Sequence, residues 1–200
     1  MLLEYSPAYA ASIAPAKIIP SPGAPAPEVR ELLAQGLNAA RGVQSRFIRF
    51  QKQATDADRA NLWNTGPEYQ WFAAYDKTKY NSLKQVFDRI AVILASTRLD
   101  VICDDTDKRY AHALPGIWKI HLGIKWIHDT DREERIQTFV HEAAHIAGRS
   151  VAKESAWYGP TQAHKEAHKH RPLRPHMALR SADNIGYFAI DLAKNFLSYV

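Results

Sequence analysis

The pentapeptide His141-Glu142-Ala143-Ala144-His145 constrains the fold of this chain more than any other feature. Residues four apart on an α-helix lie on one face, so a helix here presents His141 and His145 to the same point, with Glu142 beside them. Two histidines and a glutamate in this HExxH spacing are typical of a zinc site in which the glutamate takes a proton from water. The pattern therefore predicts a zinc-binding helix.

The flanking residues favour a helix with defined ends. Thr130 or Asp131 is suited to cap its start, with Glu134 three residues after Asp131, and Gly148 is suited to end it. An apolar stripe recurs at helical spacing, at Ile136, Phe139, Val140, Ala143 and Ala147. The alternative is a core helix that carries two histidines by chance. With nine histidines in 200 residues such a coincidence is rare, so we prefer the metal site.

The composition indicates one domain with an appendage. A hydrophobic fraction of 46% in 200 residues is enough to build a core, and Cys103 is the only cysteine, so no disulfide forms within the chain. No apolar run reaches the length of a membrane span. The chain starts with an apolar stretch that contains Glu4 and lacks a basic region, which argues against a signal peptide. We expect synthesis in the cytoplasm, and leave open export or delivery by a non-classical route.

Charge gives a weaker indication of partners. The formal net charge is +5, and much of the excess lies between Lys165 and Arg180. Such a segment attracts acidic surfaces or nucleic acid, but no aromatic residues are interleaved with the charges to stack on bases. A solvated basic loop is therefore preferred over a nucleic-acid interface. The oligomeric state is not predicted.

Most segments of the chain show the residue spacing of α-helices. Residues 1–27 hold six of the eleven prolines and are expected to form an extended arm, with one domain from 28 to 200. Within that domain the spacing predicts helices over 28–53 and 56–63, two more around 71–75 and 83–94, and a last one over 184–199. A strand is expected at 99–103, and one strand or a tight strand pair at 116–128, whose open edge would lie near the zinc helix.

Zinc in a catalytic site needs a third protein ligand and an open position for water. The candidates after the motif are Glu154, His164, His168, His170, His176 and Asp183. The third histidine of a metzincin would fall on Val151, which excludes that class. His164 and His168 are themselves four apart and suggest a second metal, but the lysines and arginines around them favour a basic surface helix.

The segment 141–159, HEAAHIAGRSVAKESAWYG, resembles the aspzincin metallopeptidases, the group of deuterolysin and the lysine-specific fungal endopeptidases. Residues 181–189, SADNIGYFA, and the segment WFAAY at 71–75 extend the resemblance over roughly residues 30 to 195. It implies an α+β fold, a mainly helical zincin-like domain with a small β-sheet beside the HExxH helix. It also implies Glu154 as the third zinc ligand, at the ninth position after His145, where the family has aspartate.

Three positions depart from the family pattern. Glutamate at 154 is one methylene longer than aspartate, and the position of the family's oxyanion tyrosine holds Trp157, with Tyr158 next to it. Tyr158 is the preferred oxyanion donor, with Trp157 kept as an alternative that also contacts substrate. Asp183 matches the first of two acidic residues that receive a substrate lysine, and Gly186 replaces the second, so a strict lysine preference is not expected. Alternatively, Asp183 caps the last helix.

The sequence thus predicts a zinc-dependent metallo-endopeptidase that acts on proteins or peptides. Zn²⁺ would be held by His141, His145 and Glu154, with Glu142 as the general base and Tyr158 at the oxyanion. A basic residue, lysine, after the scissile bond is the expected preference. The alternative from another class is a non-catalytic zinc-binding or protein-binding module, such as a delivered effector, that retains the peptidase fold.

Overall fold

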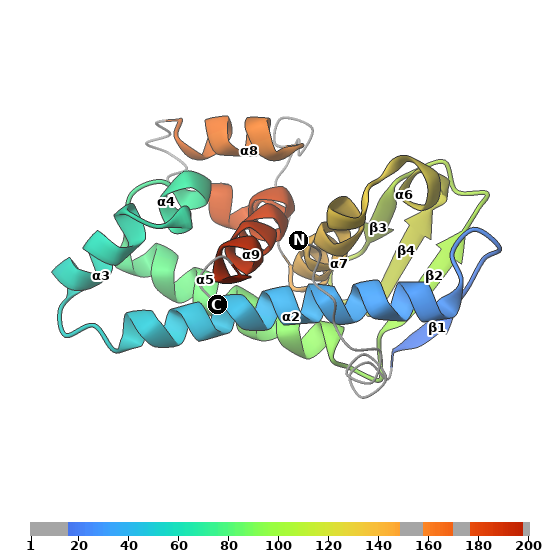
Figure 1. The fold of residues 1–200 in the computed structure, drawn as a ribbon, viewed down its shortest axis with the longest axis horizontal. Helices are drawn as coiled ribbons and strands as arrows, with labels where there is room; N and C mark the ends of the chain where they lie inside the picture. Colours follow the sequence, from blue (N-terminus) through green and yellow to red (C-terminus); the bar gives the residue numbers. More distant parts are fainter. Residues whose placement is uncertain (1–15, 149–157, 170–176, 198–200) are drawn as a thin grey trace.

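The computed structural model describes residues 16–148, 158–169 and 177–197. Helices make up most of this part of the chain, and a small sheet lies at one end (Figure 1). In chain order the elements are β1 (Lys17–Ile19), α2 (Ala26–Gln51), α3 (Asp56–Asn64), α4 (Pro67–Phe72), α5 (Lys77–Leu94), β2 (Asp100–Asp104), β3 (Ala111–Ala113), β4 (Lys119–Gly123), α6 (Ile124–Asp129), α7 (Arg132–Ile146), α8 (Pro160–Ala167), the 3-10 helix η2 (Met177–Arg180) and α9 (Ala182–Leu197).

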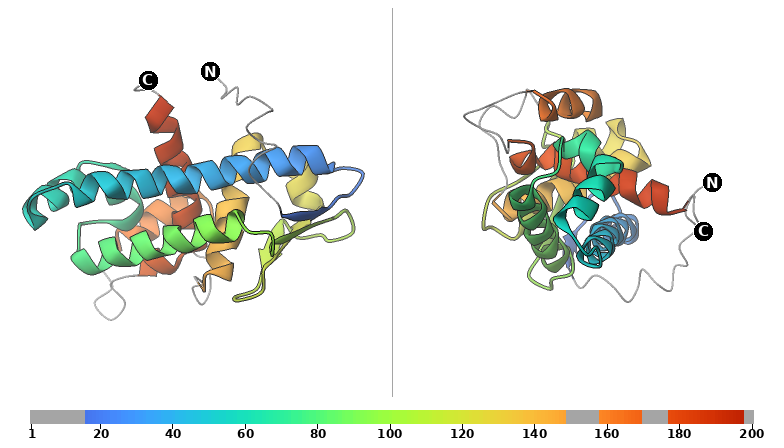
Figure 2. Two further views of the ribbon diagram at one scale, coloured as in Figure 1. Left: turned by 90° about the horizontal axis from the view of Figure 1, so that it is seen from below. Right: turned by 90° about the vertical axis from the view of Figure 1, so that its left-hand side faces the viewer.

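Helix α2 runs the length of the molecule and packs along α5 (Figure 2). Its apolar stripe recurs at helical spacing, so the whole stripe faces the core. The residues that the spacing predicted for this face are all buried: Val29, Leu32, Leu33, Leu37, Ala40, Val43, Phe47 and Phe50. The predicted helix is confirmed, and it begins at Ala26, two residues earlier than expected, because Pro27 has a backbone suited to the first turn.

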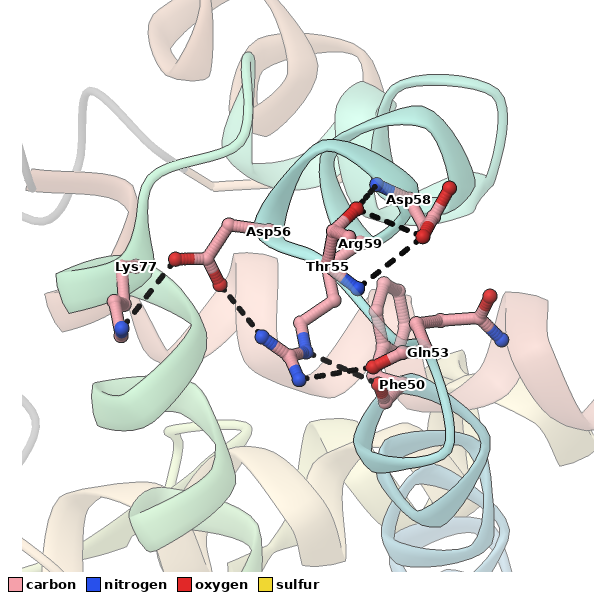
Figure 3. A network of polar contacts seen from close by, with 7 residues as sticks. All are labelled: Phe50, Gln53, Thr55, Asp56, Asp58, Arg59 and Lys77. Carbon is pink, nitrogen blue, oxygen red and sulfur yellow. Dashed lines mark hydrogen bonds and ion pairs between the residues drawn. The ribbon is translucent and has the colours of Figure 1, made fainter.

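Polar contacts fix the turn that follows α2 (Figure 3). The Thr55 hydroxyl accepts a hydrogen bond from the Asp58 backbone N–H, while the Asp58 carboxylate accepts one from the Thr55 backbone N–H, which closes a capping box at the start of α3. Arg59 donates to the carbonyl oxygens of Phe50 and Gln53 at the end of α2. The first turn of α3 is thereby tied to the last turn of α2.

The sheet has the strand order β1-β2-β4-β3. Strands β1, β2 and β4 are parallel, and β3 pairs with β4 in the antiparallel sense at one edge. Alternate residues on β2 and β4 point into the helical core, where Val101, Cys103, Ile120 and Leu122 are buried. Residues 17–19, which the proline pattern placed in the extended arm, are extended and join the sheet as β1. Residues 1–15 of that arm lie outside the described residues.

The predicted strand or strand pair over 116–128 is wrong in two respects: it is shorter than expected, and it does not form an open edge of the sheet. Only Lys119–Gly123 is a strand, and it is internal to the sheet. The second half of the segment is helix α6, with Trp126 and Ile127 buried. A short run dense in apolar residues has no clear period, so it does not distinguish a strand from a buried helix. The edge strands are β1 and β3, and β3 was not predicted from the sequence.

Helix α7 carries the HExxH motif and lies between the other helices and the sheet. It packs against α9, α2 and α5 on one side and contacts β3 and β4 on the other. The Asp131 carboxylate accepts the Glu134 backbone N–H at its start, as predicted. The helix ends at Ile146 with Ala147 as its C-cap, and Gly148 follows with a φ of 82°, a conformation that glycine adopts without strain. Within the described residues no helix is both long and apolar enough to cross a membrane.

Candidate active site

The two histidines of the motif converge as their spacing predicts. His141 Nε2 and His145 Nε2 are 3.1 Å apart on one face of α7. Two nitrogens that bind one tetrahedral zinc at about 2.0–2.1 Å each stand about 3.3 Å from one another, so the observed separation fits a shared zinc. Both side chains are partly exposed, which leaves room for further ligands.

Glu142 is the residue between them in the motif, and it is buried at 4% exposure. A carboxylate in such surroundings is held in position by its neighbours, and desolvation strengthens its interaction with a nearby proton donor. It is next to His141 in the sequence, and its side chain is buried whereas the two histidines are partly exposed.

Asp183 supports His141 from behind. One carboxylate oxygen, Oδ1, lies 2.7 Å from His141 Nδ1, and the side chain of Asp183 is only 9% exposed. A hydrogen on Nδ1 that points at the carboxylate leaves the lone pair of the imidazole on Nε2, the nitrogen that faces His145. The second oxygen, Oδ2, accepts the backbone N–H of Gly159 at 2.8 Å. Asp183 thus joins helix α9 to α7 and to the start of α8.

The cap of α9 is a different residue. The Ser181 hydroxyl accepts the backbone N–H of Asn184 at 3.2 Å, while Asp183 lies within the first turn of the helix. The Asn184 amide in turn donates to the Trp71 and Ala163 carbonyl oxygens, at 2.8 and 3.2 Å. These bonds hold α9 against α4 and α8, so the position of Asp183 depends on the packing of three helices.

The segment that would complete the site is described only in part. Glu154 and Trp157 lie outside the described residues, as do His170 and His176. Tyr158 is 58% exposed and directly precedes Gly159, whose φ of 80° turns the chain into α8. In the described part of the chain, no three histidine, cysteine, aspartate or glutamate side chains meet in a group able to hold a metal. Of the three expected ligands, His141 and His145 lie in the described residues and Glu154 does not.

The second pair of histidines packs against α4. The His164 ring lies 3.8 Å from the Trp71 ring, centroid to centroid, and His168 Nε2 is 3.1 Å from the Gln70 carbonyl oxygen. Burial lowers the pKa of His164, so this side chain is neutral at pH 7. These contacts give both side chains a role in packing α8 onto α4.

Gly186 faces helix α7 at a point of close contact. A Cβ atom at this position would lie 2.5 Å from Gln137 Nε2, so the Gln137 side chain occupies the space that a longer residue at 186 would need. Gln137 is one turn before His141 on the same face of α7. The space beside the position where the family pattern has a second acidic residue is thus filled by an amide from the helix that carries the HExxH motif.

The edge strand β3 lies beside the motif helix. It contacts α7, and the backbone N–H of Gly116, in the loop after it, donates to the Ile146 carbonyl oxygen at 3.2 Å. An unpaired strand edge next to an active site is able to pair with an extended peptide. This strand was not predicted from the sequence because its three residues, Ala-His-Ala, are too short to show a pattern.

Comparison with known proteins gives a sequence relative and a structural neighbour. The chain is 30% identical to an "extracellular protease" of Aeromonas hydrophila over 131 residues, which are 62% of this chain and 36% of that protein. Its structure matches a zinc peptidase from Grifola frondosa with a TM-score of 0.60 and 20% identity, covering 84% of this chain and 96% of that one. No protein-family model matches the chain.

The structural match confirms the predicted α+β fold, mainly helical with a small sheet beside the motif helix. The resemblance to a zinc-peptidase family, stated from the motifs, is therefore confirmed at the level of the fold. The chain spans about a third of the length of the protease that it matches in sequence.

Proposed function

We propose that this chain is a zinc-dependent metallo-endopeptidase of the aspzincin type that hydrolyses protein or peptide substrates. The observation that carries the proposal is the pair of facing nitrogens on α7, His141 Nε2 and His145 Nε2, 3.1 Å apart. The buried Glu142 beside them and the carboxylate of Asp183 behind His141 complete the described part of the arrangement. The likeness to a zinc peptidase and to an extracellular protease supports the same class of reaction.

Each residue has a role in this proposal. His141, His145 and Glu154 would hold zinc, which supplies Lewis-acid activation of a water and of the peptide carbonyl. Glu142 accepts a proton from the attacking water and returns it to the leaving amine. The Tyr158 hydroxyl, or Trp157 in its place, donates a hydrogen bond to the oxyanion of the tetrahedral intermediate.

Asp183 takes a positioning role in the proposal. Its two oxygens already contact His141 and Gly159, which favours orientation of the ligand histidine over direct contact with substrate. A similar carboxylate behind a ligand histidine fixes the ring and raises its basicity in many zinc sites. With Asp183 engaged by His141 and Gly159, the expected preference for a basic residue after the scissile bond would require carboxylates other than that of Asp183.

The protease of Aeromonas hydrophila is named as extracellular, and this suggests that the present chain also acts outside the cell that makes it. Export by a non-classical route, which the sequence left open, is part of the proposal. Fractionation of cells that express the full chain into cytoplasm and medium tests it directly.

The variant Glu142→Gln tests the chemistry. We expect the wild type and the purified variant each to hold about one zinc per chain. Hydrolysis of an unstructured protein such as denatured casein should fall by at least about 100-fold in the variant, because the amide does not accept the proton. Elemental analysis gives the metal content, and Glu154→Ala, measured alongside, should lose zinc.

Near-normal hydrolysis by Glu142→Gln would disprove the role of Glu142. A folded wild type that binds no zinc after repletion would disprove the metallopeptidase and favour the non-catalytic module instead.

A further inference from the structure

An apolar groove of about 370 Å³ lies between the last turns of α5 and the end of α7. Its apolar lining comes from these two helices and from the residue before β4: Val92, Ile93, Trp118, Ile146 and Ala147. Val92 is 63% exposed, the largest exposed fraction among the large hydrophobic side chains of the described residues. Within the described part of the chain, the groove is therefore an apolar surface without a cover.

The groove lies behind the helix that carries the HExxH motif. Ile146 and Ala147 follow His145 directly, and at about 100° per residue their side chains point about 100° and 200° away from it. The two residues therefore face away from the side of α7 on which the motif histidines meet. The groove is thus separate from the proposed active site.

Two arginines give the rim of the groove a positive charge. Arg89 lines it, and the guanidinium of Arg98 lies over the Trp118 ring, 4.9 Å from the ring centroid. Among the described residues neither arginine forms an ion pair. The carboxylate in the lining, that of Asp88, is paired with Lys84 Nζ at 2.8 Å. An apolar floor with a positive rim fits a segment that carries a carboxylate among apolar side chains.

The first strand of the sheet begins at the same end of the molecule. The Lys17 backbone N–H donates to the Leu99 carbonyl oxygen, and the Asp100 N–H donates to the Trp118 carbonyl oxygen, both at 3.0 Å. Strands β1, β2 and β4 are neighbours in that order, so the start of β1 lies about 10 Å across the sheet from Trp118. Ala16 is 2% exposed, and the chain before it therefore leaves from a fixed point near the groove.

Residues 1–15, MLLEYSPAYAASIAP, contain a segment of the required chemistry. Glu4 is their only charged side chain, and it stands between Leu3 and Tyr5. Leu3 is 13 positions before Ala16, which gives an extended reach of up to about 43 Å. This reach is several times the separation between the start of β1 and Trp118, so the segment is long enough to enter the groove.

We infer that residues 2–5 of this chain dock in the groove and cover its apolar lining. In an extended segment alternate side chains point to opposite sides, so Leu3 and Tyr5 enter the groove while Glu4 turns to Arg89 and Arg98 at the rim. The docked segment packs on the end of α7, behind the motif histidines. The inference depends on the groove and on residues 1–15, and it is independent of the proposed peptidase activity.

The test traps this contact as a disulfide in the full chain that carries Leu3→Cys and Val92→Cys. A disulfide requires the two Cα atoms to come within about 7 Å, so its formation reports docking at the groove. Burial raises the pKa of the native Cys103 thiol to about 11, so this cysteine reacts little at pH 7.5. Peptide masses after digestion identify the linked residues and the fraction of chains that are linked.

The matched control pairs Leu3→Cys with Ile48→Cys. Ile48 is an apolar residue of α2 that is 53% exposed and does not line the groove, so neither Ile48→Cys nor Val92→Cys removes a core side chain. In a glutathione redox buffer we expect the 3–92 disulfide to form at least about fivefold more than the 3–48 disulfide, because docking raises the effective concentration of the two thiols.

The charges are tested in the chain with the 3–92 cysteine pair. Glu4→Gln should lower the formation of the disulfide by about two- to fivefold, the range for one exposed ion pair. Replacing Arg89 and Arg98 together by glutamine should give the same loss, and Glu4→Gln added to that change should have no further effect. Arg41→Gln, at an exposed position on α2, is the control and should leave disulfide formation unchanged.

Equal formation of the 3–92 and 3–48 disulfides would overturn the inference. A 3–92 disulfide found only between two chains, as a dimer on a non-reducing gel, would also overturn it, because the occupant would then be the segment of a second copy. A preference for position 92 that Glu4→Gln leaves unchanged would overturn the contact of Glu4 with the arginines. Peptidase activity does not enter these outcomes, so they stand whether or not the proposed function is correct.

Discussion

At the scale of single residues, the interaction between Asp183 and His141 is the contact on which the proposed metal site depends most. His141 Nδ1 and Asp183 Oδ1 are 2.7 Å apart, and each side chain is about nine-tenths buried, so water screens the interaction little. The carboxylate determines which imidazole nitrogen carries the hydrogen and how the ring is turned. Both properties decide whether His141 faces zinc with a lone pair.

Replacing Asp183 by alanine should weaken zinc binding by about 10- to 100-fold, the range observed when such supporting carboxylates are removed. Competition with a chelator measures the dissociation constant, and circular dichroism checks that the helices remain. The Asp129→Asn variant, which also loses one carboxylate, should keep the wild-type zinc affinity. Unchanged affinity in Asp183→Ala, with a raised KM, would return Asp183 to the substrate pocket that the sequence resemblance implied.

At the scale of elements, one buried ion pair joins the long helix α2 to the short helix α4. Arg46 Nε donates to Glu68 Oε1 at 2.8 Å and Nη2 donates to Oε2 at 3.2 Å, and Glu68 is fully buried. Helix α4 has six residues and is too short to be stable alone, so it depends on such contacts. Through the Trp71 carbonyl oxygen, the same helix accepts a hydrogen bond from the Asn184 amide of α9.

The variant Glu68→Ala should lower the free energy of unfolding by about 3–5 kcal/mol, because it leaves the Arg46 guanidinium buried without its counter-charge. Urea denaturation followed by circular dichroism measures this loss. The double variant Arg46→Met/Glu68→Ala removes both charges and should recover part of the stability. A loss below about 1 kcal/mol in the single variant would mean that water reaches Arg46 and that the pair contributes as a surface pair does.

At the scale of the whole molecule, two neutral histidines make the fold sensitive to acid. Burial lowers the pKa of His112, on the edge strand, and of His164, on α8, below the ordinary value of 6.5. At a pH between the folded-state pKa of each histidine and its unfolded-state pKa of about 6.5, the unfolded chain binds more protons than the folded one. Stability is therefore fully present above about pH 6.5 and is lost as the pH falls through 6.5 and the lower folded pKa values.

Urea midpoints at pH 7.5 and pH 5 measure this dependence, and we expect a lower midpoint at pH 5. The variant His112→Gln removes one of the two groups, so its midpoint should fall less between the same pH values. His128→Gln, an exposed histidine on α6, is the control and should behave as the wild type. If His112→Gln is as acid-sensitive as the wild type, other groups are responsible.

Local rules account for much of what the sequence determined by itself. Helical spacing and capping residues are properties of neighbouring positions, so α2, α3 and α7 were predicted to within a few residues, and the HExxH spacing brought His141 and His145 together. The burial of the apolar stripe of α2 followed from the same periodicity.

Tertiary structure alone decided the arrangement of segments far apart in the chain. Asp183 reaches His141 from 42 residues away, and the apolar groove needs residues from α5, from α7 and from the segment before β4. Strand β3 becomes the edge because of its pairing with β4, and its three residues carry no such information. Contacts of this kind arise from the packing of whole helices and strands. That packing depends on the shape and buried area of the elements, which the residue spacing within one segment does not determine.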